Sequence, residues 1–76
     1  MRHELKIAPA YFDAVQAGEK TFEVRKNDRG FAKGDTVLLR EWESCEYTGR
    51  TYSARIGYVT SYGQQLGYVV FSLLPV

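Results

Sequence analysis

Apolar and polar residues alternate along most of this chain, and one segment near the N-terminus has a helical period instead. Residues 2–7 place Leu5 and Ile7 on one side, which predicts a short first strand. Pro9 suits the first turn of a helix, because the N–H that proline lacks has no helical partner there. We expect a helix over residues 9–17, ended by Gly18 in a left-handed conformation.

After this helix the period changes from helical to alternating. In residues 21–25, Phe22 and Val24 share the face expected to join the core, and Thr21, Glu23 and Arg25 share the polar face. Further strands are predicted over 36–42, 50–60 and 68–73, with a turn-rich loop at 26–33, a Gly34-Asp35 turn, a polar loop at 43–49 and a turn at 63–67.

This inventory favours an α+β, mainly β fold. One N-terminal helix and about five strands form a small closed or partly open β-barrel when a mostly antiparallel sheet curls around the helix. Closing the sheet also hides strand edges that invite aggregation. The whole chain, residues 1–76, is expected to be a single domain. The tyrosines Tyr52, Tyr58, Tyr62 and Tyr68 are expected in the barrel wall, with hydroxyls that reach water.

Composition and charge narrow the function classes. A hydrophobic content of 45% with 25% charged residues is too apolar for a disordered chain. A net charge of +1 does not fit a protein that coats a polyanion. The single cysteine, Cys45, forms no internal disulfide and no cysteine-built zinc site, so we expect a cytoplasmic protein without metal or cofactor and an inert surface thiol. No apolar run reaches the length that spans a membrane.

The densest polar feature surrounds the predicted strand at 21–25. Basic residues alternate there with acidic ones, namely Lys20, Glu23, Arg25, Lys26, Asp28 and Arg29. One interpretation is a solvated face of ion pairs, each contributing ~0–1 kcal/mol. The other is a site in which Lys20 and Arg25 bind phosphate or a carbonyl, and Glu23 orients Arg25 or accepts a hydrogen bond from the exocyclic amine of a base.

A family resemblance favours the second interpretation. Gly18, Lys20, Glu23 and Arg25 match the G-x-K-x-x-E-x-R signature of ASCH domains, which belong to the PUA-like superfamily. Gly34-Asp35 before an apolar strand is similar to the G-D turn of that superfamily. With Glu41-Trp42 and Tyr47-Thr48-Gly49-Arg50, the chain resembles a small uncharacterised bacterial and phage subgroup.

The resemblance implies a PUA-like barrel with a cleft beside the helix, and RNA or a nucleotide as the ligand. Some similar proteins are hydrolases that remove the acyl group from N4-acetylated cytidine. This sequence departs from them, because Glu23 replaces a Thr and residues 60–67 are too few for the helical insert that carries their second carboxylate. If the protein is an enzyme, Lys20 and Glu23 would be its acid–base pair.

Other residues complete the predicted site. His3 and Tyr11 are expected near the cleft, Asn27 and Arg29 at its entrance, and Trp42 either in the core or stacked on a base with Tyr47 nearby. Arg50 and Arg55 extend a positive rim or are simply solvated. The predicted ligand-binding residues are Lys20, Thr21, Glu23, Arg25, Asn27, Arg29, His3, Tyr11 and Trp42. A third function class, a protein-interaction module that binds a host nucleoprotein, stays open, as does the oligomeric state.

Overall fold

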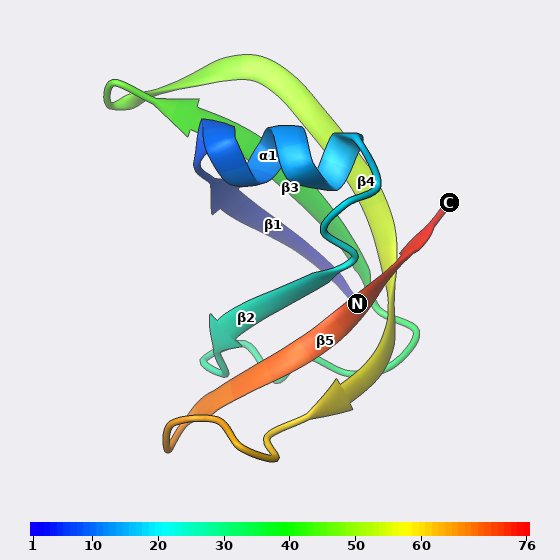
Figure 1. The fold of residues 1–76 in the computed structure, drawn as a ribbon. Coiled ribbons are helices and arrows are strands. Elements are labelled where there is room, and N and C mark those ends of the chain that lie inside the picture. The colour runs from blue at the N-terminus through cyan, green and yellow to red at the C-terminus, as the bar shows by residue number, and fades with distance from the viewer.

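Residues 1–76 are described here by a computed structural model. The chain forms a curved five-stranded sheet and one helix (Figure 1). The elements in chain order are β1 (Arg2–Ile7), α1 (Pro9–Gln16), β2 (Phe22–Lys26), β3 (Thr36–Glu43), β4 (Glu46–Thr60) and β5 (Tyr68–Pro75). The prediction of a mainly β fold with five strands and an N-terminal helix is confirmed.

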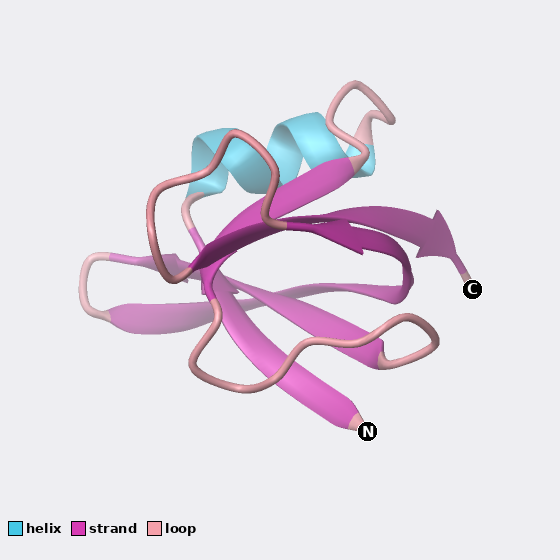
Figure 2. Cartoon of the chain, turned by 90° about the horizontal axis from the view of Figure 1, so that it is seen from below, coloured by secondary structure: helices cyan, strands magenta, loops and turns pink.

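The sheet is a half-barrel with the strand order β1-β3-β4-β5-β2. The β1–β3 pair is parallel, and the three remaining pairs are antiparallel. Seen from below, the strands curve around a shared interior (Figure 2). The edge strands β1 and β2 are not paired with each other, so the partly open form of the predicted barrel is the one observed.

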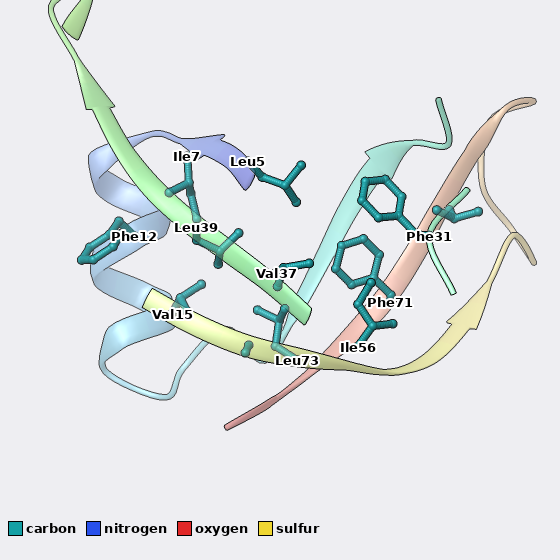
Figure 3. Close-up of a cluster of buried hydrophobic side chains, with 12 residues drawn as sticks. Leu5, Ile7, Phe12, Val15, Phe31, Val37, Leu39, Ile56, Phe71 and Leu73 are labelled. Carbon is teal, nitrogen blue, oxygen red and sulfur yellow. The ribbon is translucent and has the colours of Figure 1, made fainter. Parts of the chain in front are cut away.

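The core consists of twelve buried apolar side chains on the concave side of the sheet. α1 lies across one end of the half-barrel and buries Phe12 and Val15 (Figure 1). At the other end Phe31, from the β2–β3 loop, packs its ring against Phe71 at a centroid separation of 4.9 Å. Figure 3 shows these two ends of the core, which are joined by Ile7, Val37, Leu39, Ile56 and Leu73.

α1 begins and ends where the sequence predicts. Pro9 occupies the first turn, and the helix ends at Gln16 with Ala17 as its C-terminal cap. Gly18 then has a φ of +78°, a left-handed conformation that a residue with a Cβ adopts at a cost. None of the helical structure has the length and apolar character that crossing a membrane requires.

The prediction of a polar loop at 43–49 is wrong. β3 and β4 extend into a hairpin there, in which Trp42 pairs with Tyr47 and Glu43 with Glu46, and the register shifts between Arg40 and Trp42. The turn consists of Ser44 and Cys45, whose φ angles are +52° and +66°. A two-residue turn with positive φ at both central positions usually has Asn or Gly there, so the sequence lacked the usual signal. Cys45 is exposed, as expected.

The placement of Tyr62 in the barrel wall is wrong, because it lies in the turn after β4 and is 90% exposed, whereas Tyr58 lies in β4 as predicted and is 72% exposed. A bulge between Ile56 and Val59 shifts the register of β4 against β5 and turns Tyr58 outward. The Tyr58 N–H donates to Oγ of Ser72 at 2.8 Å. Gly57 permits this close approach, because a Cβ there would lie 2.5 Å from that same oxygen.

The two faces of β2 are opposite to the prediction. Glu23 pairs with Phe71 and points inward, where it is 4% exposed. Phe22 and Val24 point outward and are 44% and 46% exposed. β2 is an edge strand at the opening of the half-barrel, so part of its inward face lies beside that opening, where charged side chains can be paired.

Candidate functional site

A hollow of about 470 Å³ lies between the two edge strands and the start of the helix. Its position follows from the sheet order, because β1 and β2 leave the half-barrel open there. A volume of this size is typical of small-molecule sites. The lining residues come from β1, α1, the turn after it and β2, and are Lys6, Ile7, Ala8, Tyr11, Lys20, Glu23, Val24 and Arg25.

Glu23 is the central charged group of this hollow. Nζ of Lys20 donates to Oε1 of Glu23, and Nε of Arg25 donates to Oε2 at 2.8 Å. The Glu23 side chain is only 5% exposed, whereas those of Lys20 and Arg25 are 17% and 25% exposed. A buried carboxylate is costly unless it is paired, and two cations supply that pairing here.

The end of the helix positions Lys20. After the left-handed Gly18, the backbone N–H groups of Glu19 and Lys20 both donate to the carbonyl of Ala14, at 2.9 and 3.0 Å. Nζ of Lys20 also donates to the Phe22 carbonyl at 2.7 Å. The same ammonium lies 5.8 Å from the ring centroid of Tyr11, within range of a cation–π interaction.

Two arginines, one from β2 and one from the loop after it, reach across the opening to β1. Nη2 of Arg25 donates to the carbonyl of Lys6 at 2.7 Å, and Nη1 of Arg29 donates to the carbonyl of Glu4 at 2.8 Å. These guanidinium groups therefore take the place of ladder hydrogen bonds between the two edge strands. Arg25 belongs both to the wall of the hollow and to this bridge.

The structure brings Tyr11, Lys20, Glu23 and Arg25 together around one hollow. The remaining predicted residues lie elsewhere or have other partners. Oδ1 of Asn27 accepts the Phe31 N–H at 3.1 Å and so orders the β2–β3 loop. The Thr21 carbonyl accepts the Leu73 N–H at 2.9 Å, which extends the β2–β5 pairing. Neither residue lines the hollow.

His3 and Trp42 are also outside the hollow. His3 is 4% exposed, packs against Phe31 in a tilted arrangement at a centroid separation of 4.8 Å, and donates from Nε2 to Oδ2 of Asp35 at 2.9 Å. Trp42 lies half-buried on the outer side of β3, against Tyr47 and beneath Lys6. The expected approach of His3 to the cleft is therefore wrong, and Trp42 is joined to the hollow only through Lys6.

Sequence reasoning missed a second buried carboxylate, Glu41, on the inward side of β3. Arg50 donates to both of its oxygens, at 2.9 Å from Nε and 2.6 Å from Nη2, and the Thr48 hydroxyl donates at 2.6 Å. Nη2 of Arg50 also donates to Asp13 of α1 at 2.8 Å. These hydrogen bonds, first from Arg50 and then from Thr48, lower the pKa of Glu41 from 4.5 to about 2.

Asp35 is a third strongly paired carboxylate, in the turn before β3. Hydrogen bonds from His3 and then from the Met1 amino group lower the pKa of Asp35 from 3.8 to about 2.

No three His, Cys, Asp or Glu side chains gather as metal ligands in residues 1–76. The polar and aromatic groups that line the hollow are the carboxylate of Glu23, the cations of Lys6, Lys20 and Arg25, and the ring of Tyr11.

The Glu23 cluster keeps hydrogen-bonding capacity beyond its internal contacts. A carboxylate has about four acceptor positions, and Lys20 and Arg25 fill two of those on Glu23. Nε and Nη2 of Arg25 have partners, and Nη1 has none within the chain. Glu23 therefore keeps unfilled acceptor positions and Arg25 an unpaired Nη1, and both residues line the hollow.

Residues 2–73 match the family described as a domain of unknown function, DUF3850. The chain belongs to the DUF3850 family. It is also similar to an uncharacterised 12.9 kDa protein in the GpA 3' region of Escherichia phage P2, with 48% identity over 58 residues. That alignment covers 76% of this chain and 53% of the phage protein, so the DUF3850 chain spans about half the length of this relative. A phage relative agrees with the predicted phage subgroup, and the ASCH resemblance stays a prediction.

Proposed function

We propose that this DUF3850 protein is a PUA-like, ASCH-type module that binds RNA or a nucleotide and holds one nucleobase in the hollow. The observation that carries the proposal is the buried Glu23 with Lys20 and Arg25 at the wall of a 470 Å³ hollow. The G-x-K-x-x-E-x-R motif supports the same conclusion, because its three charged residues, Lys20, Glu23 and Arg25, all line the hollow.

The chemistry of the hollow suits a base with an exocyclic amine beside a carbonyl. The free acceptor positions of Glu23 match an amine such as N4 of cytosine, because a carboxylate accepts from it. Lys20 and Nη1 of Arg25 match a carbonyl or a phosphate oxygen. Tyr11 is 59% exposed at the wall and offers a ring face to a planar ligand.

The first test is a set of NMR titrations of the uniformly labelled protein with the four ribonucleoside monophosphates. We expect saturable amide shifts at the lining residues, largest for cytidine or guanosine monophosphate. Lys20→Ala is expected to weaken this binding about tenfold or more, because it removes a charge-assisted donor. The matched control is Lys26→Ala, which removes an exposed lysine at the end of β2 that does not line the hollow.

A second pair of variants tests the carboxylate itself. Glu23→Gln should remove the preference among bases, and Glu19→Gln, at an exposed neighbouring position, should keep it. The proposal fails if none of the nucleotides shifts the lining amides, or if Lys20→Ala and Lys26→Ala bind equally well.

A second candidate is amide hydrolysis of an acylated nucleoside. The direct contact of Lys20 with Glu23 inside the hollow favours it, since such a pair is able to exchange a proton with a bound substrate. Incubation with N4-acetylcytidine, followed by chromatography for free cytidine, tests this candidate. Turnover that Lys20→Ala abolishes supports it, and no release above that variant excludes this substrate.

A further inference from the structure

The outer face of β1, β3 and β4 begins where the hollow ends. On these strands the side chains that alternate with the core residues point away from it, and the strand register sets them in rows. They include four cations and one carboxylate together with a tryptophan–tyrosine pair, namely Arg2, Lys6, Arg40, Arg55, Glu4, Trp42 and Tyr47. This surface is called the β1–β3–β4 face below.

Two cations of this face lie against its two aromatic rings. Nζ of Lys6 lies 4.0 Å from the ring centroid of Trp42, and Cζ of Arg40 lies 3.7 Å from that of Tyr47. The two rings meet edge to face at 4.9 Å and 81°. Tyr47 is 39% exposed and Trp42 is half-buried. The rings are thus held at the surface, next to cations.

Lys6 connects this face to the hollow. It lines the hollow and at the same time lies over Trp42. Its neighbour across the sheet is Arg40, with which it is in register. A chain that leaves the hollow past Lys6 therefore meets Arg40, Trp42 and Tyr47 next.

We propose that the β1–β3–β4 face binds the nucleotides that flank the one in the hollow, so that the ligand is a single-stranded RNA of several nucleotides. This inference rests on the proposed function. Surfaces that bind single strands combine cations for the backbone with aromatic rings for the bases. Unpaired bases are required, because bases stacked inside a duplex do not present their planes to a side chain.

Charge distinguishes this face from the outer face of β2 and β5. There the exposed side chains are mainly apolar, with Phe22, Val24 and Leu74 each between 44% and 48% exposed. On the β1–β3–β4 face the four cations outnumber the single carboxylate, although the whole chain has a net charge of only +1. An anionic backbone therefore matches this side of the molecule.

The test measures affinity against length, by fluorescence anisotropy with labelled unstructured RNAs of one to about six nucleotides. We expect the affinity to rise with length. Tyr47→Ser should reduce the affinity for the longest RNA about tenfold, in the range expected for loss of one base stack, and leave mononucleotide binding unchanged. Tyr62→Ser, at a 90% exposed tyrosine of the β4–β5 turn, is the matched control.

Two further measurements distinguish base stacking and phosphate contacts on this face from non-specific binding. Trp42 is the single tryptophan, so its fluorescence should be quenched by the longer RNAs and not by mononucleotides. Arg40→Gln should lower the slope of log affinity against log salt by about 0.7, the value for one phosphate contact on a single strand.

The outcomes distinguish this inference from the proposed function. In one outcome, mononucleotides shift the amides of the hollow while affinity does not rise with RNA length and Trp42 is not quenched. That result overturns RNA binding on the β1–β3–β4 face and leaves the proposed function of the hollow intact. Equal losses of RNA affinity in Tyr47→Ser and Tyr62→Ser also overturn RNA binding on the β1–β3–β4 face. If no mononucleotide binds the hollow, the proposed function fails, and the inference that depends on it fails too.

Discussion

Two buried glutamates, Glu23 and Glu41, have nearly the same environment by simple measures. Their side chains are 5% and 6% exposed, and an arginine donates to each of them. They lie beside different faces of α1, since Tyr11 lines the hollow of Glu23 and Asp13 binds the arginine of Glu41. Burial and charge pairing alone would mark both as candidate sites.

Their hydrogen bonds separate them. Glu41 receives three donors, from Arg50 and Thr48, and the same Arg50 ties β4 to α1 through Asp13. Glu23 receives two donors and borders an open hollow. The Glu41 cluster therefore has the hydrogen bonds of a structural network, in which the partly exposed Arg50 links the buried Glu41 to Asp13 at the surface. Free hydrogen-bonding capacity beside a hollow is the better sign of a binding site.

The largest expected effect compares the two arginines. Arg50→Met leaves Glu41 buried without its paired partner and releases α1, so the thermal midpoint should fall by more than about 10 °C. Arg25→Met should lower the midpoint much less, because Lys20 still pairs with Glu23 at the open side. Thermal unfolding followed by circular dichroism measures both. Equal falls in the thermal midpoint would contradict the assignment of a structural role to the Glu41 cluster and of a binding role to the Glu23 cluster.

Acid unfolding tests the Glu41 cluster further. A carboxylate with a lowered pKa stabilises the fold fully above its ordinary pKa and loses this contribution as pH falls toward the folded value. For Glu41 the window runs from pH 4.5 down to about 2, and for Asp35 from 3.8 down to about 2. Urea unfolding across this range should show a shallower loss of stability in Glu41→Gln, and likewise in Asp35→Asn. A profile of Glu41→Gln parallel to that of the parent would refute the pairing.

A smaller effect is expected at Thr48. Thr48→Val removes one hydroxyl donor to Glu41 and should cost about 1–2 kcal/mol of unfolding free energy. Thr51→Val, on the outer side of β4 opposite Arg40, should stay within about 0.5 kcal/mol of the parent. Urea unfolding at neutral pH distinguishes the two, and the prediction is wrong if their costs match.

The smallest stability effect is expected in the hollow. Tyr11→Phe removes a hydroxyl that has no hydrogen-bond partner within the chain, at a residue that is 59% exposed. The unfolding free energy should change by less than about 0.5 kcal/mol. A larger loss would show that the wall of the hollow has a structural role, and would weaken the contrast with Glu41.

Local patterns were enough to predict much of the fold. Strand β1, the helix from Pro9 and its end at Gly18 follow from period and capping, which depend on neighbouring residues. The Ser44-Cys45 turn was missed because it has positive φ without Asn or Gly. The faces of β2 were reversed because alternation does not show that a strand borders an opening.

Of the predicted site residues, Tyr11 on the helix and the three charged residues of the motif line the hollow. Lys20, Glu23 and Arg25 lie within one motif, and the structure brings them together. His3 and Arg29 have partners from distant segments, Asp35 and Glu4, which no local pattern reveals. For Glu41 a signal was present, since a carboxylate in line with Val37 and Leu39 on a buried strand face requires a partner.

The bridge between the edge strands has a consequence for self-association. An unpaired strand edge offers its carbonyls as a template for a strand of another molecule, which is the first step toward fibres. In this chain, Arg25 and Arg29 occupy the carbonyls of Lys6 and Glu4 on that edge. A foreign strand would have to displace two charged groups before it could pair there. These arginines therefore make this edge of the open half-barrel a poorer template for intermolecular β-sheet growth.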